Sequence, residues 1–377
     1  MEDLAGLLSS LVAIDSTNPD LIPGAAGEAE IAGAIARWLE RAGLEVRMLE
    51  SAAGRPNVVA VARGSGGGKS LLLNGHMDTV GVGDFADAHK QRVEDGRLYG
   101  RGAYDMKGGL AACMQAVAAA KKRNLRGDVI LTAVVDEEYA SLGTATVIET
   151  VCADAAIVAE FTEMQIILAH KGFVWFDIET TGRAAHGSRP DLGVDAIAHM
   201  GRVLVQLEEM DRALRSDATH PLLGSGSLHA GLIRGGQEIS SYPEHCTLSV
   251  ERRTLPGESP EDVEAALVGL LRGLRRLDPD FRASLKRGIS RAPLETPEDA
   301  PIAQAVQRAA TGVLGHPAPI AGVPFWTDAA ILSAAGIPSL LFGPAGAGAH
   351  AAEEWVDLAS VEACAQVYLA TAMEWCS

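Results

Sequence analysis

Two apolar runs in this chain end directly on side chains that can bind cations, and these runs decide the fold. Residues 71–78 read LLLNGHMD, and residues 129–138 read VILTAVVDEE. Each run has the length and composition of a buried strand, and each ends on histidine or acidic residues. The carboxyl ends of strands in an open α/β sheet line its functional crevice, so such residues can converge from distant parts of the sequence. The pattern predicts a metal-dependent enzyme.

Three further candidate ligands have a related setting. Glu160 ends the apolar run AAIVAE, and the run at 339–342 leads through a glycine-rich turn to His350. Asp105 instead follows a GRGAY turn and precedes an alanine-rich stretch, 106–123, which we expect to be a helix whose amino end favours a carboxylate. Taken singly, each residue has a simpler interpretation: a helix cap for Asp105, a strand-end surface acid for Glu160 and a loop histidine for His350.

Glu137 and Glu138 are adjacent acids that follow a seven-residue apolar strand. Their negative charges would repel each other unless a cation or a proton neutralises one of them. The two acids are therefore expected to have different roles. The natural division makes one a ligand and the other a general base beside a metal-activated water. The alternative is that both simply begin the next helix at its favourable amino end. His76 and Asp78 could be a ligating imidazole and its supporting carboxylate, although the same pair can be a capping or surface arrangement.

The number of ligands indicates two metal ions rather than one. With one of the adjacent acids set aside as the base, the candidate set comprises two imidazoles and three carboxylates: His76, Asp105, Glu138, Glu160 and His350. Five ligands are too many for one tetrahedral zinc with an open position, which uses three protein ligands. They suit two metals about 3.5–4 Å apart and bridged by one carboxylate. Oxygen and imidazole donors without thiolates admit zinc, cobalt or manganese.

The composition excludes several classes of protein. The 377 residues are 47% hydrophobic and 21% charged, which is enough for one large or two smaller globular cores. The net charge of −17, from 32 basic and 49 acidic residues, argues against a nucleic-acid or anionic-membrane partner. The acidic start MEDL and the lack of an apolar run of roughly 18 residues predict a cytoplasmic protein without signal peptide or membrane span. Five cysteines without CxxC spacing argue against disulfides or a thiolate zinc site.

The order of expected elements indicates two domains. Strands alternate with helices up to about residue 172, which predicts an α/β domain on a mainly parallel sheet with covered faces. The rhythm then changes to strand, helix, strand, strand, helix, strand, which is the ferredoxin-like α+β pattern. We therefore expect a discontinuous catalytic domain, residues 1–172 and 293–377, interrupted by an inserted domain at 173–292. The insertion's expected strands are 173–180, 227–233, 246–252 and 281–286, and its expected helices are 194–214 and 260–277.

Four motifs together resemble one known group of enzymes. They are GHMDTV at 75–80, GRGAYDMKGG at 100–109, DEE at 136–138 and AH at 349–350, followed by Glu354. The resemblance is to the dinuclear zinc metallopeptidase family that contains acetylornithine deacetylase, succinyl-diaminopimelate desuccinylase, aminoacylase and the glutamate carboxypeptidases. It runs from near residue 14 to near residue 357 in the family's order and roughly its spacing.

The resemblance implies a role for each candidate residue. Glu137 would be the general base, and Asp78 would orient His76. Two zinc ions would be the cofactors, with cobalt or manganese as alternatives. The implied ligand sets are His76, Asp105 and Glu160 for one metal and Asp105, Glu138 and His350 for the other, so that Asp105 bridges them.

The inserted domain carries matches of its own. Residues 182–190 read GRAAHGSRP and resemble the family's lid motif, whose histidine in dimeric members reaches the partner's active site and stabilises the oxyanion. This implies a homodimer formed through a lid and dimerisation domain, with His186 as the catalytic residue. Arg253 begins an RTLPG segment that resembles the one binding the substrate's carboxylate. Two positions depart from the family's pattern, since Ser240 replaces a common asparagine among the substrate contacts and Trp326 replaces a frequent glycine before Thr-Asp.

The leading hypothesis for function is an amidohydrolase that cleaves the amide bond of an N-acyl amino acid or a related small amide with a free carboxylate. The runner-up is a carboxypeptidase or dipeptidase of the same family. A dimetal phosphoesterase could use the same ligand types, but the motif context disfavours it. A catalytically silent protein on the same scaffold is disfavoured because Glu137 and the full ligand set are present.

Overall fold

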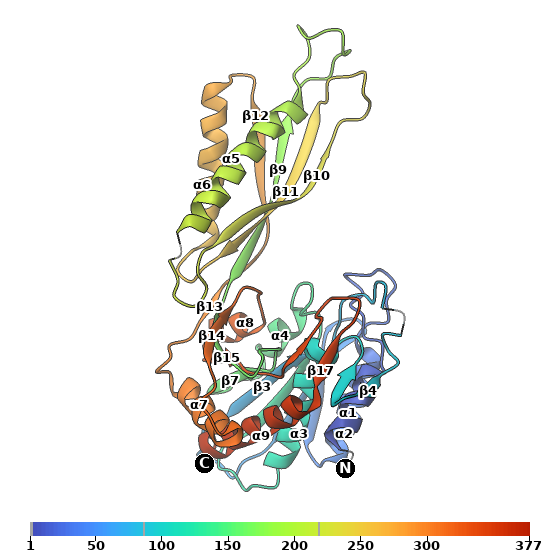
Figure 1. Cartoon of the computed structure of the whole chain (residues 1–377), viewed down its shortest axis with the longest axis vertical. Helices are drawn as coiled ribbons and strands as arrows, with labels where there is room; N and C mark the ends of the chain where they lie inside the picture. Colours follow the sequence, from blue (N-terminus) through green and yellow to red (C-terminus); the bar gives the residue numbers. More distant parts are fainter. Residues whose placement is uncertain (1–2, 86, 218) are drawn as a thin grey trace. The chain divides into compact units, whose positions relative to one another are not determined.

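The computed structural model describes residues 3–85, 87–217 and 219–377, so Met1 and Glu2 of the acidic start lie outside the described residues. The chain divides into two compact units (Figure 1). The first comprises Met1–Leu168, Thr296–Ala321 and Thr327–Ser377, and the second comprises Ala169–Glu295 with Gly322–Trp326. The second unit contains the stretch expected as an insertion and adds short flanking segments. Among the described residues, no helix combines the length and the apolarity that a membrane crossing requires.

The first unit is built on a sheet whose centre is parallel. Its strands, in the order in which they pair, are β1 (Glu45–Ala52), β2 (Arg55–Ala62), β6 (Val129–Val134), β3 (Leu71–His76), β7 (Ala155–Val158), β15 (Ser339–Leu341) and β8 (Ile166–His170). The last two residues of β8 belong to the second unit and pair there with β13 (Leu294–Glu295), and β14 (Ile320–Val323) also pairs with β8. The strands β6, β3, β7 and β15 run parallel, which confirms the expected α/β fold. The strands β1, β2 and β8 pair antiparallel, which the strand–helix alternation does not predict.

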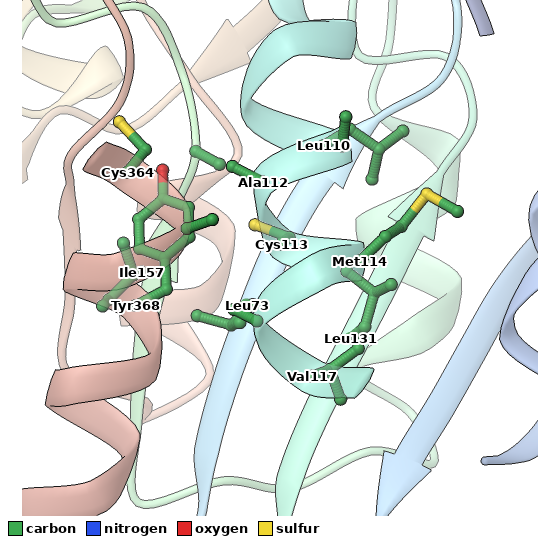
Figure 2. Close-up of a cluster of buried hydrophobic side chains, with 14 of the residues drawn as sticks. Leu73, Leu110, Ala112, Cys113, Met114, Val117, Leu131, Ile157, Cys364 and Tyr368 are labelled. Atoms are coloured by element: carbon green, nitrogen blue, oxygen red, sulfur yellow. The ribbon is translucent and has the colours of Figure 1, made fainter. Parts of the chain in front are cut away.

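The core of this unit surrounds one apolar helix. α3 (Gly108–Ala120) is alanine-rich and buried along almost all of its length, so it must be enclosed by other elements. It packs against α9 (Leu358–Trp375) and against the sheet. Figure 2 shows this cluster, in which side chains of α3 meet Tyr368 and Cys364 of α9 and apolar side chains of the central strands. The unit's other helices are α1 (Leu4–Val12), α2 (Ala29–Arg41), α4 (Leu142–Val147), α7 (Pro301–Leu314) and α8 (Ala329–Ala334).

A second, small sheet joins segments that are far apart in the sequence. Its strands, in pairing order, are β16 (Gly346–Ala347), β17 (Trp355–Asp357), β5 (Arg97–Tyr99) and β4 (Arg92–Glu94). β17 and β5 are antiparallel, with Trp355 opposite Tyr99. The chain that follows β5 and the chain that precedes β17 therefore meet at the same end of this ladder.

The second unit has the ferredoxin-like arrangement expected from the sequence. Its elements are β9 (Gly172–Thr181), α5 (Ala196–Ser216), β10 (Ser227–Gly235), β11 (His245–Thr254), α6 (Pro260–Leu277) and β12 (Arg282–Arg291). The strands form one antiparallel sheet in the order β10-β11-β9-β12. Alternate strand residues such as Phe176, Ile178 and Leu248 are buried in one core together with apolar residues of α5 and α6. The alternation in β9 and β11 explains why the sequence predicts these two strands within two residues. β12 does not alternate in its second half and extends five residues beyond the expected strand.

Candidate metal centre

Four candidate residues lie where central parallel strands end. β3 ends at His76, Glu137 and Glu138 follow β6 after a turn at Asp136 where φ is +68°, and Glu160 comes two residues after β7. Because β6, β3 and β7 are parallel neighbours, their carboxyl ends share one edge of the sheet. The register of these strands therefore brings residues from three separate stretches of the sequence to one place.

Asp105 lies between two imidazoles. Its Oδ1 is 3.1 Å from Nε2 of His76, and its Oδ2 is 3.2 Å from Nε2 of His350. Nε2 of His76 also lies 3.6 Å from Oε1 of Glu160, and Nε2 of His350 lies 3.1 Å from Oε2 of Glu138. The two oxygens of one carboxylate thus face two separate groups of potential ligands, which is the arrangement a bridging carboxylate requires.

Glu137 belongs to the same cluster. Its Oε2 lies 4.0 Å from Nε2 of His76, and its side chain is 10% exposed. Potential ligand atoms of His76, Glu137 and Glu160 fall within 4.8 Å of one another, as do those of His76, Asp105 and Glu138. Geometry alone therefore does not separate Glu137 from the ligands, and its assignment as the base stays a prediction.

Burial makes the carboxylates of the cluster costly to ionise. Burial, reinforced by neighbouring carboxylates, raises the pKa of Glu137 and of Glu160 well above the ordinary value and raises the pKa of Glu138 to about 7. Asp105 differs, because hydrogen bonds with both imidazoles outweigh its burial and hold its pKa below the usual range. The carboxyls of Glu137, Glu138 and Glu160 therefore favour their neutral form unless a positive partner stabilises the ionised one.

The imidazoles supply part of that positive charge, and a divalent cation would supply more. Burial alone would lower the pKa of His76, but Asp105, Glu160 and Asp78 outweigh it and raise this pKa well above 6.5. Hydrogen bonds to Asp105 and Glu138 raise the pKa of His350 to about 10. Metal ions displace such protons, because ligating imidazoles are neutral and ligating carboxylates are ionised. The donor set of nitrogen and carboxylate oxygen therefore fits two divalent metal ions.

Asp78 supports the cluster chiefly through backbone groups. Its buried carboxylate accepts the N–H groups of Glu137 and Glu138, each at 3.1 Å, and the side-chain amide of Asn18 at 2.8 Å. His76 Nδ1 lies 2.9 Å from the backbone oxygen of Asp78 and 3.7 Å from its carboxylate. The carboxylate thus holds the turn that carries the two adjacent acids, and the closest contact to the imidazole comes from the main chain.

Sequence reasoning missed a buried ion network behind this turn. Arg55 pairs with Glu28 and, at 3.1 Å, with Asp136. Asn18 Nδ2 links Asp136 Oδ1, at 3.0 Å, to Asp78. Neither an arginine before a proline nor an asparagine in a Ser-Thr-Asn-Pro stretch indicates a partner far away in the sequence.

Asp328 is a second residue that the sequence did not assign to the cluster. It is fully buried and accepts a hydrogen bond of 2.7 Å from the hydroxyl of Thr144. Burial raises its pKa to about 6, and its charge in turn raises the pKa of Glu137 and Glu160. Its place in the Thr-Asp pair after Trp326 was the available signal.

The three remaining candidates belong to the second unit. His186 is exposed, and its Nδ1 lies 2.8 Å from the hydroxyl of Ser188. Its loop lies against that of Ser240, because the N–H of Gly187 donates to the backbone oxygen of Ser240 at 2.6 Å. Arg253 lies on β11, where its Nε donates to Glu251 at 2.7 Å. The fold thus brings the His186 and Ser240 loops together, while Arg253 comes from a strand.

Strand-end carboxylates and imidazoles that share one bridging acid are typical of dinuclear metal hydrolases. The model of peptidase family M20/M25/M40 matches residues 72–374, and the chain belongs to this family. It is 32% identical over 387 residues to an acetylornithine deacetylase from Myxococcus xanthus, covering 99% of this chain and 97% of that protein. The chain is thus a metal-dependent hydrolase that acts on amide bonds.

Solved structures agree on the fold. A tripeptidase from Staphylococcus aureus superposes with a TM-score of 0.82 at 20% identity, covering 99% of this chain and 98% of that one. The YXEP protein of Bacillus subtilis, a dinuclear metal-binding peptidase of the M20 family, gives a TM-score of 0.77 at 17% identity, covering 99% of this chain and 97% of that one. Both match nearly the whole chain, so the two units are part of the shared fold.

Proposed function

We propose that this protein hydrolyses the amide bond of an N-acyl amino acid with one water molecule and releases a carboxylic acid and the free amino acid. The observation that carries the proposal is the cluster of potential metal ligands around His76, which includes the carboxyl of Glu137. The full-length similarity to an acetylornithine deacetylase supports the substrate class. A carboxypeptidase or dipeptidase activity is the alternative outcome of the test below.

The ligand chemistry supports two divalent ions, zinc in the first place, with cobalt or manganese able to replace it. When bound, these ions lower the pKa of a water molecule and polarise the scissile carbonyl. The residues that would hold them are His76, Asp105 and Glu160 for one ion and Asp105, Glu138 and His350 for the other.

Glu137 is the proposed proton carrier of the reaction. Its carboxylate takes a proton from the attacking water and passes it to the nitrogen of the leaving amine. Burial raises its pKa, which makes its carboxylate a stronger base. The hydrogen bond from its N–H to Asp78 fixes the backbone from which this side chain projects.

The second unit supplies substrate recognition in this proposal. His186 would stabilise the oxyanion in the active site of a partner subunit, and Arg253 would bind the substrate's carboxylate. Ser240, whose loop contacts that of His186, would make a separate substrate contact. The exposed position of His186 supports a role outside its own unit. Leu232 and Ile233 on the edge strand β10 are 61% and 52% exposed, which supports a homodimer interface along this unit.

The proposed partners are therefore a small amide substrate and a second copy of the chain. The charge of −17 supports the expectation that neither nucleic acid nor an anionic membrane is a partner. The cytoplasmic location expected from the sequence stays a prediction.

The experiment compares the wild type with Glu137→Gln on acetyl-, succinyl- and peptidyl-amino acids, with metal content measured in parallel. We expect an acyl-amino acid to be the preferred substrate, activity to disappear with a chelator and return with zinc or cobalt, and Glu137→Gln to lower kcat by about 10²–10⁴-fold with both metals bound. Glu149→Gln, which changes an exposed acid, would serve as the control for loss of an acid outside the ligand cluster. Near-normal turnover of Glu137→Gln with both metals bound would refute the assignment of the base, and preferred cleavage of peptides would favour the peptidase alternative.

A further inference from the structure

Glu354 is a fully buried acid whose carboxylate is surrounded by donors from one turn. Its Oε1 accepts the N–H groups of Tyr104 at 2.9 Å and Asp105 at 3.0 Å. Its Oε2 accepts the N–H of Gly102 at 3.0 Å and Nη1 of Arg101 at 2.7 Å. Four hydrogen bonds therefore tie this carboxylate to the segment that carries the candidate bridging ligand.

The small sheet brings Glu354 to this turn from about 250 residues away in the sequence. Trp355 of β17 pairs with Tyr99 of β5, so Glu354 directly precedes one strand where Gly100 directly follows the other. The N–H of Gly100 continues the contact by donating to the backbone oxygen of Glu354 at 3.0 Å. The register of two short strands thus determines which carboxylate reaches the turn.

Arg101 and Glu354 also hold the loop that carries His350. Arg101 Nη2 donates to the backbone oxygen of Ala351 at 2.9 Å while its Nη1 binds Glu354. Ala351 directly follows His350, whose φ is +62° and whose side chain is 53% exposed. Arg101 and Glu354 together therefore fix the backbone on both sides of the contact between Asp105 and His350.

The backbone at Asp105 needs such support. It lies in a single π-helical turn, η1 (Ala103–Lys107), which the N–H of Gly108 closes by donating to the backbone oxygen of Ala103. Within this turn the φ of −113° and ψ of 95° at Asp105 are not helical. A buried N–H outside a regular ladder must find another acceptor, and a carboxylate provides a charge-assisted one. The peptide that orients the Asp105 carboxylate toward both imidazoles is therefore held by Glu354.

We propose that Glu354 is a positioning residue of the metal centre, which sets metal affinity by holding Asp105 and the His350 loop in one geometry. Glu354 acts through these backbone segments and not on the substrate. The inference rests on the proposed two-metal function. A residue that only stabilised the fold would lower the melting temperature without changing metal affinity, and this difference makes the proposal testable.

The test measures zinc affinity and stoichiometry of Glu354→Gln by competition with a chromophoric chelator, together with the melting temperature. Glutamine keeps the size but replaces one acceptor oxygen by an amide group that donates, so in either orientation this group faces two of the four donors. We expect the Kd for zinc to rise by about 10–100-fold, as for partners that orient metal ligands, and activity to return toward the wild-type level in excess zinc. The adjacent Glu353→Gln, whose side chain is 66% exposed, is the matched control and should leave the Kd unchanged.

A second control separates stability from positioning. Leu39→Ala truncates a buried side chain of α2 and should lower the melting temperature with the zinc Kd unchanged. The proposal is overturned if the zinc Kd of Glu354→Gln stays within about twofold of the wild-type value while its melting temperature falls as in Leu39→Ala. If Glu354→Gln does not fold, Arg101→Met provides the same test, because it removes the guanidinium and leaves Glu354 in place.

For Arg101→Met we expect a weaker zinc affinity in the same direction, and an unchanged affinity overturns the proposal. A wild-type protein that binds no zinc, cobalt or manganese would instead refute the two-metal function on which the inference rests. The two failures are distinguishable, since one is observed on the wild type and the other only on the variants.

Discussion

At the residue scale, buried carboxylates in this protein organise the backbone around the candidate metal ligands. Asp78 accepts the N–H groups of Glu137 and Glu138, and Glu354 accepts that of Asp105 and two of its neighbours. Turns that follow a strand leave N–H groups without ladder partners, and such groups must be satisfied when they are buried. A carboxylate can accept several of them at once, which explains why Asp78 and Glu354 lie beside the cluster of candidate ligands.

The buried Arg55 network yields a stability prediction. Its side chain is 9% exposed and pairs with Glu28 and Asp136, so Arg55→Met would leave two buried acids without their partner. We expect the free energy of unfolding to fall by about 3–5 kcal/mol, measured by urea denaturation. The control is Arg63→Met, because this 53% exposed arginine also pairs with two acids, and its loss should change stability by at most about 1 kcal/mol.

The defect of Arg55→Met should also depend on pH. Burial already raises the pKa of Glu28 and Asp136 in the folded protein, and removal of the guanidinium raises it further. A carboxyl with a raised folded pKa stabilises the fold below its unfolded pKa, and this contribution is lost as the pH rises through the folded pKa. The stability difference from the wild type should therefore be smaller at about pH 5 than at about pH 8. An equal or larger difference at the lower pH would contradict this interpretation.

At the element scale, the close approach of α3 to the end of β7 positions Glu160. A Cβ on Gly109 would lie 1.8 Å from the backbone oxygen of Ala159, the residue before Glu160. Gly109→Ala should force the helix away from the strand, lower stability by about 1–3 kcal/mol and weaken metal binding. Thermal unfolding and zinc titration measure the two effects.

A glycine in the second unit provides the matched control. Gly269 lies within α6, and a Cβ there would meet nothing within 4 Å. Gly269→Ala should raise stability by about 0.5–1 kcal/mol, since alanine loses less conformational freedom on folding. Equal effects of the two substitutions would show that the approach of α3 to β7 does not matter.

The elements differ in how far the sequence predicts them. The helix at 260–277 follows from its serine cap, its proline at the first position and its apolar periodicity, and it has the bounds expected. The alanine-rich helix begins at Gly108 instead of 106, because Asp105 and Met106 have non-helical backbone. The strands of the small sheet have two or three residues, which is too short to show an alternation of apolar and polar side chains. Their pairing is a tertiary contact, so the sequence does not predict this sheet.

At the scale of the whole molecule, the role of His186 can be tested by mixing subunits. Glu137→Gln and His186→Ala should each be nearly inactive alone. If His186 acts on the partner's site, a mixed dimer has one complete site, and random reassociation should restore about a quarter of the wild-type activity. No recovery after mixing, or a monomer with full activity, would contradict the role across subunits.

The sequence by itself determines the chemistry of this protein. Apolar runs that end on acids and histidines predict the α/β sheet, the cluster of candidate ligands and the insertion, because side-chain period and strand ends are local properties. Only the tertiary structure decides which atoms meet. The two oxygens of Asp105 face different imidazoles, Asp78 holds a turn, and Glu354 reaches Asp105 through the register of β17 and β5. Such contacts depend on the register of the strands and on the need of buried backbone groups for hydrogen-bond partners. The sequence alone reveals neither the register nor these partners.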